Sequence, residues 1–155
     1  MSETQEWLVC QSDPIPDDVA RMLATVPEWF GDPQSNAEYI EDARTKETWT
    51  ISDNGKVIGV ILLSRHFPQT AEIHFMLVDR EFHGQGVGTA LIQAIAKDAK
   101  EKGVKLLEVK TLGASHPDKN YARTRYFYEK LGFIPLEETE LWGADTPCLI
   151  MVKPL

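Results

Sequence analysis

The chain has 155 residues, of which 43% are hydrophobic and 26% charged, and its formal net charge at pH 7 is -8. This length and composition predict one globular domain, residues 1–155, with a sizeable core. The acidic balance disfavours nucleic acid as a partner and mildly favours a cationic substrate, while the apolar runs are too short to cross a membrane.

The N-terminal half alternates short strands with two helices. Residues 1–6 are polar and acidic and carry no export signal, so we expect a cytoplasmic protein. The expected elements are, in chain order, a strand at 6–10, a helix that starts after Pro14–Asp18 and stops at Pro27, a helix at 36–46, a hairpin of strands 48–52 and 57–63 around Asn54-Gly55, and a strand at 72–78.

The C-terminal half supplies a strand, helix, strand run and a final hairpin. Its expected elements are a helix at 88–102, a strand at 104–110, a helix at 121–131, and strands at 133–137 and 147–153. The run implies a right-handed crossover between two parallel strands, whereas the hairpins are antiparallel. We therefore expect an α/β (α+β) fold of three layers, in which helices cover both faces of a mixed, mostly antiparallel central sheet.

The two cysteines give no sign of a disulfide or a metal site. Cys10 and Cys148 lie near opposite ends of the chain and have no metal-like spacing. We expect two reduced thiols, no disulfide and no metal.

Three glycines, Gly84, Gly86 and Gly88, stand directly before the helix at 88–102. A glycine loop that leads into a helix N-terminus presents N–H groups to phosphate oxygens. A Walker loop would need a Lys-Ser or Lys-Thr pair where this chain has Thr89-Ala90. The dinucleotide fingerprint fails because its last glycine is missing and residues 79–83 are too long for its tight turn.

A third design fits these residues. The strand Ala71–Val78, five further residues and the loop Gly84-Gln85-Gly86-Val87-Gly88 resemble the acetyl-CoA-binding segment of the GNAT superfamily of N-acetyltransferases. The run Phe127-Tyr128-Glu129-Lys130-Leu131-Gly132-Phe133 resembles the tyrosine helix and the Gly-Phe strand of that superfamily. Together the two segments cover about the last ninety residues.

The resemblance implies acetyl-CoA as the acyl donor. In the superfamily, the strand's main chain holds the thioester and the pantetheine, and the loop holds the pyrophosphate. The positions implied here are Met76, Leu77, Val78, His83, Gly84, Gln85, Gly86, Val87, Gly88 and Thr89. His83 departs from the family's Arg or Gln, although an imidazole can still donate a hydrogen bond to phosphate. A register shifted to Gln85, Gly88 and Ala90 also fits the motif, but it would push the loop into the helix.

Acetyl transfer to an amine needs a base and an acid, because the ammonium must lose a proton and the thiolate must gain one. Alternation along the strand directs Glu72 away from the apolar set. Its Ala-Glu-Ile-x-Phe context is similar to the histone lysine acetyltransferase branch of the superfamily, in which the matching glutamate is the general base. His74 on the same face stays open as a rival base. The resemblance implies that the N–H of Met76 polarises the acetyl carbonyl and that Tyr128 is the general acid.

The acceptor is the part that the sequence leaves open. The family builds its acceptor pocket from the first two helices and the last hairpin, which makes Trp29, Phe30 and Trp142 candidates for its wall. A polyamine, an aminoglycoside, an amino acid and a protein amine all fit, and the family's frequent dimers allow a homodimer. The alternative function is a non-catalytic acyl-CoA-binding regulatory module, and a nicotinamide-binding enzyme is the remote third.

Overall fold

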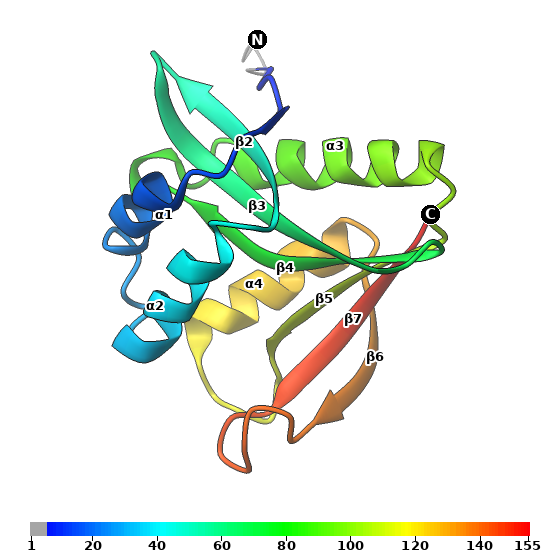
Figure 1. Cartoon of the computed structure of the whole chain (residues 1–155). Coiled ribbons are helices and arrows are strands. Elements are labelled where there is room, and N and C mark those ends of the chain that lie inside the picture. Colours follow the sequence, from blue (N-terminus) through cyan, green and yellow to red (C-terminus); the bar gives the residue numbers. More distant parts are fainter. Residues whose placement is uncertain (1–5) are drawn as a thin grey trace, which may run out of the picture. The chain divides into compact units, whose positions relative to one another are not determined.

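A strand order of β1-β2-β3-β4-β5-β7-β6 defines one seven-stranded sheet in the computed structural model, which describes residues 6–155 (Figure 1). The elements are β1 (Cys10–Ser12), α1 (Pro16–Leu23), α2 (Pro33–Asp42), β2 (Glu47–Asp53), β3 (Lys56–Phe67), β4 (Thr70–Val78), the 3₁₀ turn η1 (Arg80–Phe82), α3 (Val87–Glu101), β5 (Leu106–Leu112), α4 (Lys119–Lys130), β6 (Ile134–Thr139) and β7 (Cys148–Pro154). Residues 1–5, on which the expected lack of an export signal depends, lie outside the described part.

The sheet is mixed, as the sequence predicts. β4 and β5 run parallel on either side of the α3 crossover, whereas β1 with β2, β2 with β3, β5 with β7 and β6 with β7 are antiparallel. The expected fold class, a mostly antiparallel sheet combined with helices, is confirmed. The chain forms two compact units, the first made of residues up to Ser64 with Phe75–Ile95 and the second of Arg65–His74 with Ala96–Leu155.

In the first unit, helices cover both faces of the strands. Buried residues of α1, β3 and β4, together with two residues that follow α1 and α2, form one core: Val19, Met22, Leu23, Val26, Ala43, Val60, Leu62, Phe75 and Leu77. Gly59, next to Val60 on β3, faces the other way, because a Cβ built there would lie 2.7 Å from Val87 Cγ1 and 3.2 Å from Leu91 Cδ1 of α3. The missing side chain at Gly59 thus lets the first turns of α3 lie directly on β3.

In the second unit, β5 is the central strand. It pairs with β4 from Thr70–Leu106 to Ile73–Val109 and with β7 from Leu106–Pro154 to Leu112–Cys148. Leu107, Val109 and Met151 are buried on these strands, and α4 packs beside β5. Cys148 is buried and Cys10 is exposed, and both are free thiols.

Some element boundaries differ from those expected. The strand predicted at 6–10 is wrong, because β1 is Cys10–Ser12 and residues 6–9 are not in a strand. Trp7 instead donates its indole N–H to the carbonyl of Gln85. α2 begins at Pro33, earlier than expected, because the Asp32 carboxylate caps the N–H groups of Gln34 and Ser35. Within the described residues, no helix has the length and apolar character needed to cross a bilayer.

Candidate active site

The glycine loop turns the backbone sharply into the start of α3. Gly84 and Gly86 adopt φ angles of 75° and 81°, which residues with a side chain rarely adopt, and α3 begins directly afterwards at Val87. The N–H of Ala90 bonds the carbonyl of Gly86 at 3.0 Å and closes the first turn. Val87, Gly88 and Thr89 precede it, in the turn where helical N–H groups lack intrahelical partners. Gly88 itself lies within the helix, so its role is not a left-handed backbone.

Hydrogen bonds from the side chains of Trp7 and His83 hold the glycine loop in place. Trp7 donates Nε1–H to the Gln85 carbonyl at 2.8 Å and meets Phe82 edge-on, with ring centroids 6.1 Å apart. His83 Nε2 lies 2.8 Å from the carbonyl oxygen of Val78, which makes this nitrogen the donor, and its ring meets Trp29 edge-on at 5.6 Å. His83 therefore ties the loop to the end of β4. No local signal assigns Trp7 to the loop, because 78 residues separate it from Gln85.

A buried aspartate holds the start of the loop. Asp79 is 3% exposed, and its carboxylate accepts a hydrogen bond from the N–H of Glu81 at 3.0 Å. The same carboxylate forms an ion pair with the guanidinium of Arg21 on α1 at 3.4 Å. Its own N–H bonds the carbonyl of Ile58 at 2.8 Å. Because each of its polar groups has a partner, Asp79 can end β4 and start η1 while buried. Sequence reasoning treated Asp79 only as part of a connecting segment.

We expect Trp7→Phe to weaken acetyl-CoA binding about fivefold, because it removes one hydrogen bond to the loop, worth about 1 kcal/mol, while keeping the ring against Phe82. Isothermal titration calorimetry measures the change. Trp142→Phe is the matched control, since Trp142 is 43% exposed in the connection between β6 and β7. Equal affinity of wild type and Trp7→Phe would contradict the role given to Trp7.

Main-chain groups at the end of β4 lie beyond its pairing with β5. The parallel register ends at Ile73–Val109, whereas β4 continues to Val78. Met76, Leu77 and Val78 belong to this continuation, and alternate burial leaves Met76 and Val78 half-buried and Leu77 buried. The carbonyl of Val78 already accepts His83. Met76 and Leu77 therefore keep main-chain groups at this end of β4 that the parallel register does not use.

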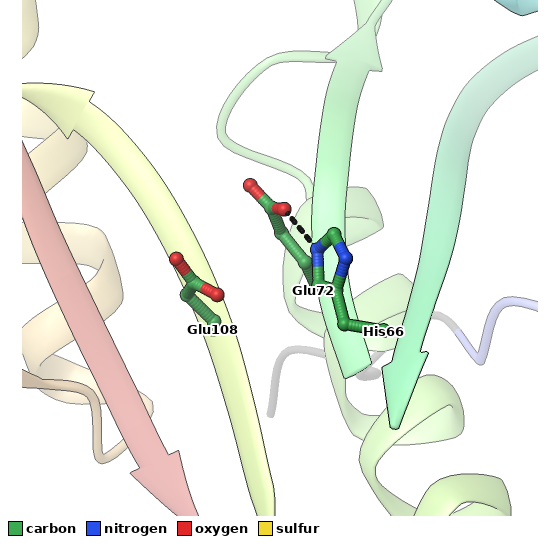
Figure 2. Close-up of side chains that lie close together, drawn as sticks. All are labelled: His66, Glu72 and Glu108. Atoms are coloured by element: carbon green, nitrogen blue, oxygen red, sulfur yellow. Dashed lines mark hydrogen bonds and ion pairs between the residues drawn. The ribbon is translucent and has the colours of Figure 1, made fainter. Parts of the chain in front are cut away.

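Glu72 is buried and forms the centre of an ionic cluster in the second unit (Figure 2). Its Oε1 lies 2.6 Å from Nε2 of His66 on β3, and its Oε2 lies 2.8 Å from Nζ of Lys110 on β5. Lys110 also meets Oε1 of Glu108 at 3.0 Å, and Glu108 stands directly opposite Glu72 in the parallel register. Both oxygens of the Glu72 carboxylate are therefore engaged.

The cluster lowers the basicity of Glu72. Burial favours the neutral acid, but hydrogen bonds and charge from Lys110 and His66 outweigh it and hold the pKa of Glu72 below its usual value. Burial acts on Lys110 in the opposite sense, and the bonds from Glu72 and Glu108 outweigh it, so the pKa of Lys110 is raised. Glu72 is thus a firmly ionised carboxylate, well suited to orient a partner and less suited to take a proton itself.

His66, Glu72 and Glu108 also have ligand atoms within 4.8 Å of one another, as three ligands of a metal ion would. The ammonium of Lys110 already lies between the two carboxylates, at 2.8 Å and 3.0 Å. Since the ammonium of Lys110 already stands between these carboxylates, where a metal ion would otherwise lie, we propose no metal here.

Tyr128 of α4 is buried against aromatic rings. It is 5% exposed, and its ring centroid lies 5.4 Å from those of Phe127 and Phe133. Burial, with a smaller contribution from Tyr121, raises the pKa of Tyr128 above its usual value. The phenol therefore keeps its proton across the physiological range, which is the form that a proton donor needs.

The predicted acceptor residues have different surroundings. Trp29 lies against His83 of the glycine loop, whereas Phe30 packs on Tyr39 and Phe75 beside the core of the first unit. Trp142 is in the connection after β6, and His74 is half-buried on β4.

The sequence analysis did not identify His66 as a site residue, although only the two-residue turn at Pro68 and Gln69 separates its strand from that of Glu72.

Known proteins share both the sequence pattern and the fold. A model of the acetyltransferase (GNAT) family matches residues 16–133. An uncharacterised N-acetyltransferase of Methanocaldococcus jannaschii is 32% identical in an alignment of 99 positions that covers 57% of this chain and only 39% of that relative's length. A GNAT-family protein from Desulfovibrio desulfuricans has a TM-score of 0.83 at 17% identity, over 96% of this chain and 99% of that one.

A GNAT family acetyltransferase from Elizabethkingia anophelis, crystallised with acetyl-CoA bound, has a TM-score of 0.71 at 21% identity, over 96% of this chain and 98% of that one. At these identities the solved structures speak for the fold, whereas the family model covers most of the sequence itself. The glycine loop, the tyrosine helix and the mixed sheet lead to the same conclusion: the chain belongs to the acetyltransferase (GNAT) family.

Proposed function

We propose that this chain transfers an acetyl group from acetyl-CoA to a primary amine, by direct attack of the amine on the thioester in a ternary complex. The observation that carries the proposal is the glycine loop, in which Gly84 and Gly86 turn the backbone into the start of α3. N–H groups at a helix N-terminus favour phosphate oxygens, and coenzyme A carries a diphosphate. The acetyl-CoA bound to the Elizabethkingia anophelis relative supports the same donor.

The proposed roles follow the chemistry of acyl transfer. An ammonium must lose a proton before the amine can attack. The pair formed by Glu72 and its hydrogen-bonded partner His66 accepts this proton. The N–H of Met76 polarises the acetyl carbonyl and stabilises the oxyanion that forms during attack. Tyr128, with its raised pKa, carries the proton that the departing thiolate takes, and the second proton that the amine nitrogen loses restores the phenol. The overall reaction converts an ammonium and a thioester into an amide, a thiol and one released proton.

A panel of amines tests this function. Free thiol released from acetyl-CoA is measured with a thiol reagent in the presence of a polyamine, an aminoglycoside, an amino acid and a peptide with a free N-terminus. We expect at least one amine to accelerate thiol release and to yield its acetylated form by mass spectrometry. Calorimetry with acetyl-CoA, and with NAD as a control ligand, measures donor binding in the same preparation.

The panel also separates the proposal from its rival. Binding of acetyl-CoA without amine-dependent thiol release by any amine would favour a non-catalytic acyl-CoA-binding module. Binding of NAD in preference to acetyl-CoA would contradict both functions. The acceptor that reacts fastest identifies the substrate class, either a small-molecule amine or a protein amine.

A further inference from the structure

The Glu72 carboxylate is shielded from solvent, whereas its partner His66 is accessible. The side chain of His66 is 48% exposed and that of Glu72 only 8%, although the two are joined at 2.6 Å (Figure 2). An amine in solution would therefore meet the imidazole before the carboxylate. This difference decides which of the two groups can exchange a proton with a substrate.

Hydrogen bonding sets the tautomer of His66. An ionised carboxylate only accepts hydrogen bonds, so Nε2 of His66 must carry the proton that points at Glu72 Oε1. The lone pair of the neutral ring is then on Nδ1. Lys110, at 2.8 Å from the other carboxylate oxygen, keeps Glu72 ionised and in place. A buried carboxylate that fixes the tautomer of an imidazole is the arrangement that makes histidine a general base in acyl transfer.

A groove reaches His66 from solvent. It measures about 390 Å³, and its lining combines His66, Thr70 and Glu108 with the apolar side chains Phe67, Leu106 and Leu136. Glu108 adds a carboxylate, which favours a cationic group in the groove. The charged groups around the imidazole are Glu72 on β4, Glu108 and Lys110 on β5, and Arg65 and Lys102, which line a second hollow together with His66.

We propose that His66 is a catalytic residue that takes the proton from the acceptor ammonium on Nδ1, and that Glu72 is the positioning residue behind it. The inference rests on the proposed acetyltransferase function. The N–H bond of the ammonium breaks, its electron pair stays on nitrogen as the nucleophile, and the proton forms the imidazolium of His66. The imidazolium then gives this proton to water, which accounts for the one proton released in the overall reaction.

The test compares His66→Gln with His74→Gln, which alters the rival histidine on β4. We expect His66→Gln to lower kcat/KM about 100-fold at pH 7, and the deficit to shrink as the pH approaches the amine's own pKa near 10, where the amine needs no base. Its affinity for acetyl-CoA should stay within twofold of wild type. Added imidazole should restore part of the activity of His66→Ala, and Glu72→Gln should lose rate near neutral pH without losing acetyl-CoA affinity.

The measurement separates every outcome. If His66→Gln keeps wild-type activity, the role of His66 is overturned while the proposed function stands. The same holds if its loss of activity is equally large at pH 9.5 and imidazole does not restore the activity of His66→Ala. A loss confined to His74→Gln does the same. Absence of amine-dependent thiol release in the wild type overturns the proposed function and this inference with it. ¹⁵N NMR of the wild type reads the tautomer independently of activity, and a proton on Nδ1 of the neutral ring would contradict the proposal.

Discussion

Tyr128→Phe is expected to lower kcat about 100-fold or more, because it removes the hydroxyl that we propose as proton donor to the departing thiolate. The phenyl ring keeps the packing against Phe127 and Phe133, so acetyl-CoA affinity and the fold should change little. Stopped-time assays of thiol release measure kcat, and calorimetry measures donor binding.

The position of Tyr128 makes a sharp control possible. Tyr126, two residues earlier on the same helix, is 62% exposed, so Tyr126→Phe should keep full activity. Because the pKa of Tyr128 is raised above its usual value of about 10, loss of its proton should not limit the rate below that pH. A fully active Tyr128→Phe would remove this residue from the mechanism.

Lys110→Met is expected to lower the free energy of unfolding by about 3 kcal/mol at pH 7, because it leaves two neighbouring carboxylates without their common cation. Lys110 is 24% exposed and bonds both Glu72 and Glu108. Removing the Lys110 ammonium also removes the ion pair that keeps the Glu72 carboxylate in place. The acetyltransferase activity that depends on the His66–Glu72 pair should therefore fall together with stability. Urea denaturation gives the free energy.

The pH dependence of this difference has a definite sign. The pKa of Glu72 is lowered in the folded chain, so its stabilising contribution is present above the unfolded value of about 4.3 and is lost as the pH falls through the lowered value. The pKa of Lys110 is raised, so its contribution is present below about 10.4 and is lost as the pH rises through the raised value. The gap between wild type and Lys110→Met should therefore be widest at pH 5 to 10, within these limits.

Lys105→Met serves as the matched control. Lys105 precedes β5 and is exposed, so its replacement should change the free energy of unfolding by less than about 0.5 kcal/mol. If Lys105→Met and Lys110→Met were equally destabilised, or if the Lys110→Met deficit did not shrink at pH 3, the ionic cluster would not be the cause.

Local sequence signals predicted most of the fold. The Asn54-Gly55 turn gave the β2–β3 hairpin, and the glycines before an amphipathic run gave the loop and the start of α3. Boundaries failed where a tertiary contact outweighed a local preference. The apolar run before Cys10 reads as a short strand, but the indole of Trp7 bonds the glycine loop instead.

The proton-accepting centre shows the limit of such signals. Alternation along β4 separated Glu72 from the apolar residues, but it did not show which groups surround the side chain. The structure buries Glu72 to 6% exposure, because His66 and Lys110 approach from the strands on either side. Lys110 is 38 residues away in the chain, and nothing in its local sequence announces the pairing.

By itself, the sequence determined the order of the elements, the glycine loop and the family, because hydrophobic periodicity, turn residues and helix-start motifs act over a few neighbouring residues. Only the tertiary structure decided which charges meet. Pairing of β4 with β5 sets Glu72 opposite Glu108, brings Lys110 between them and leaves His66 at the solvent side. The basicity of a carboxylate depends on such neighbours and on burial, and both arise when distant strands come together.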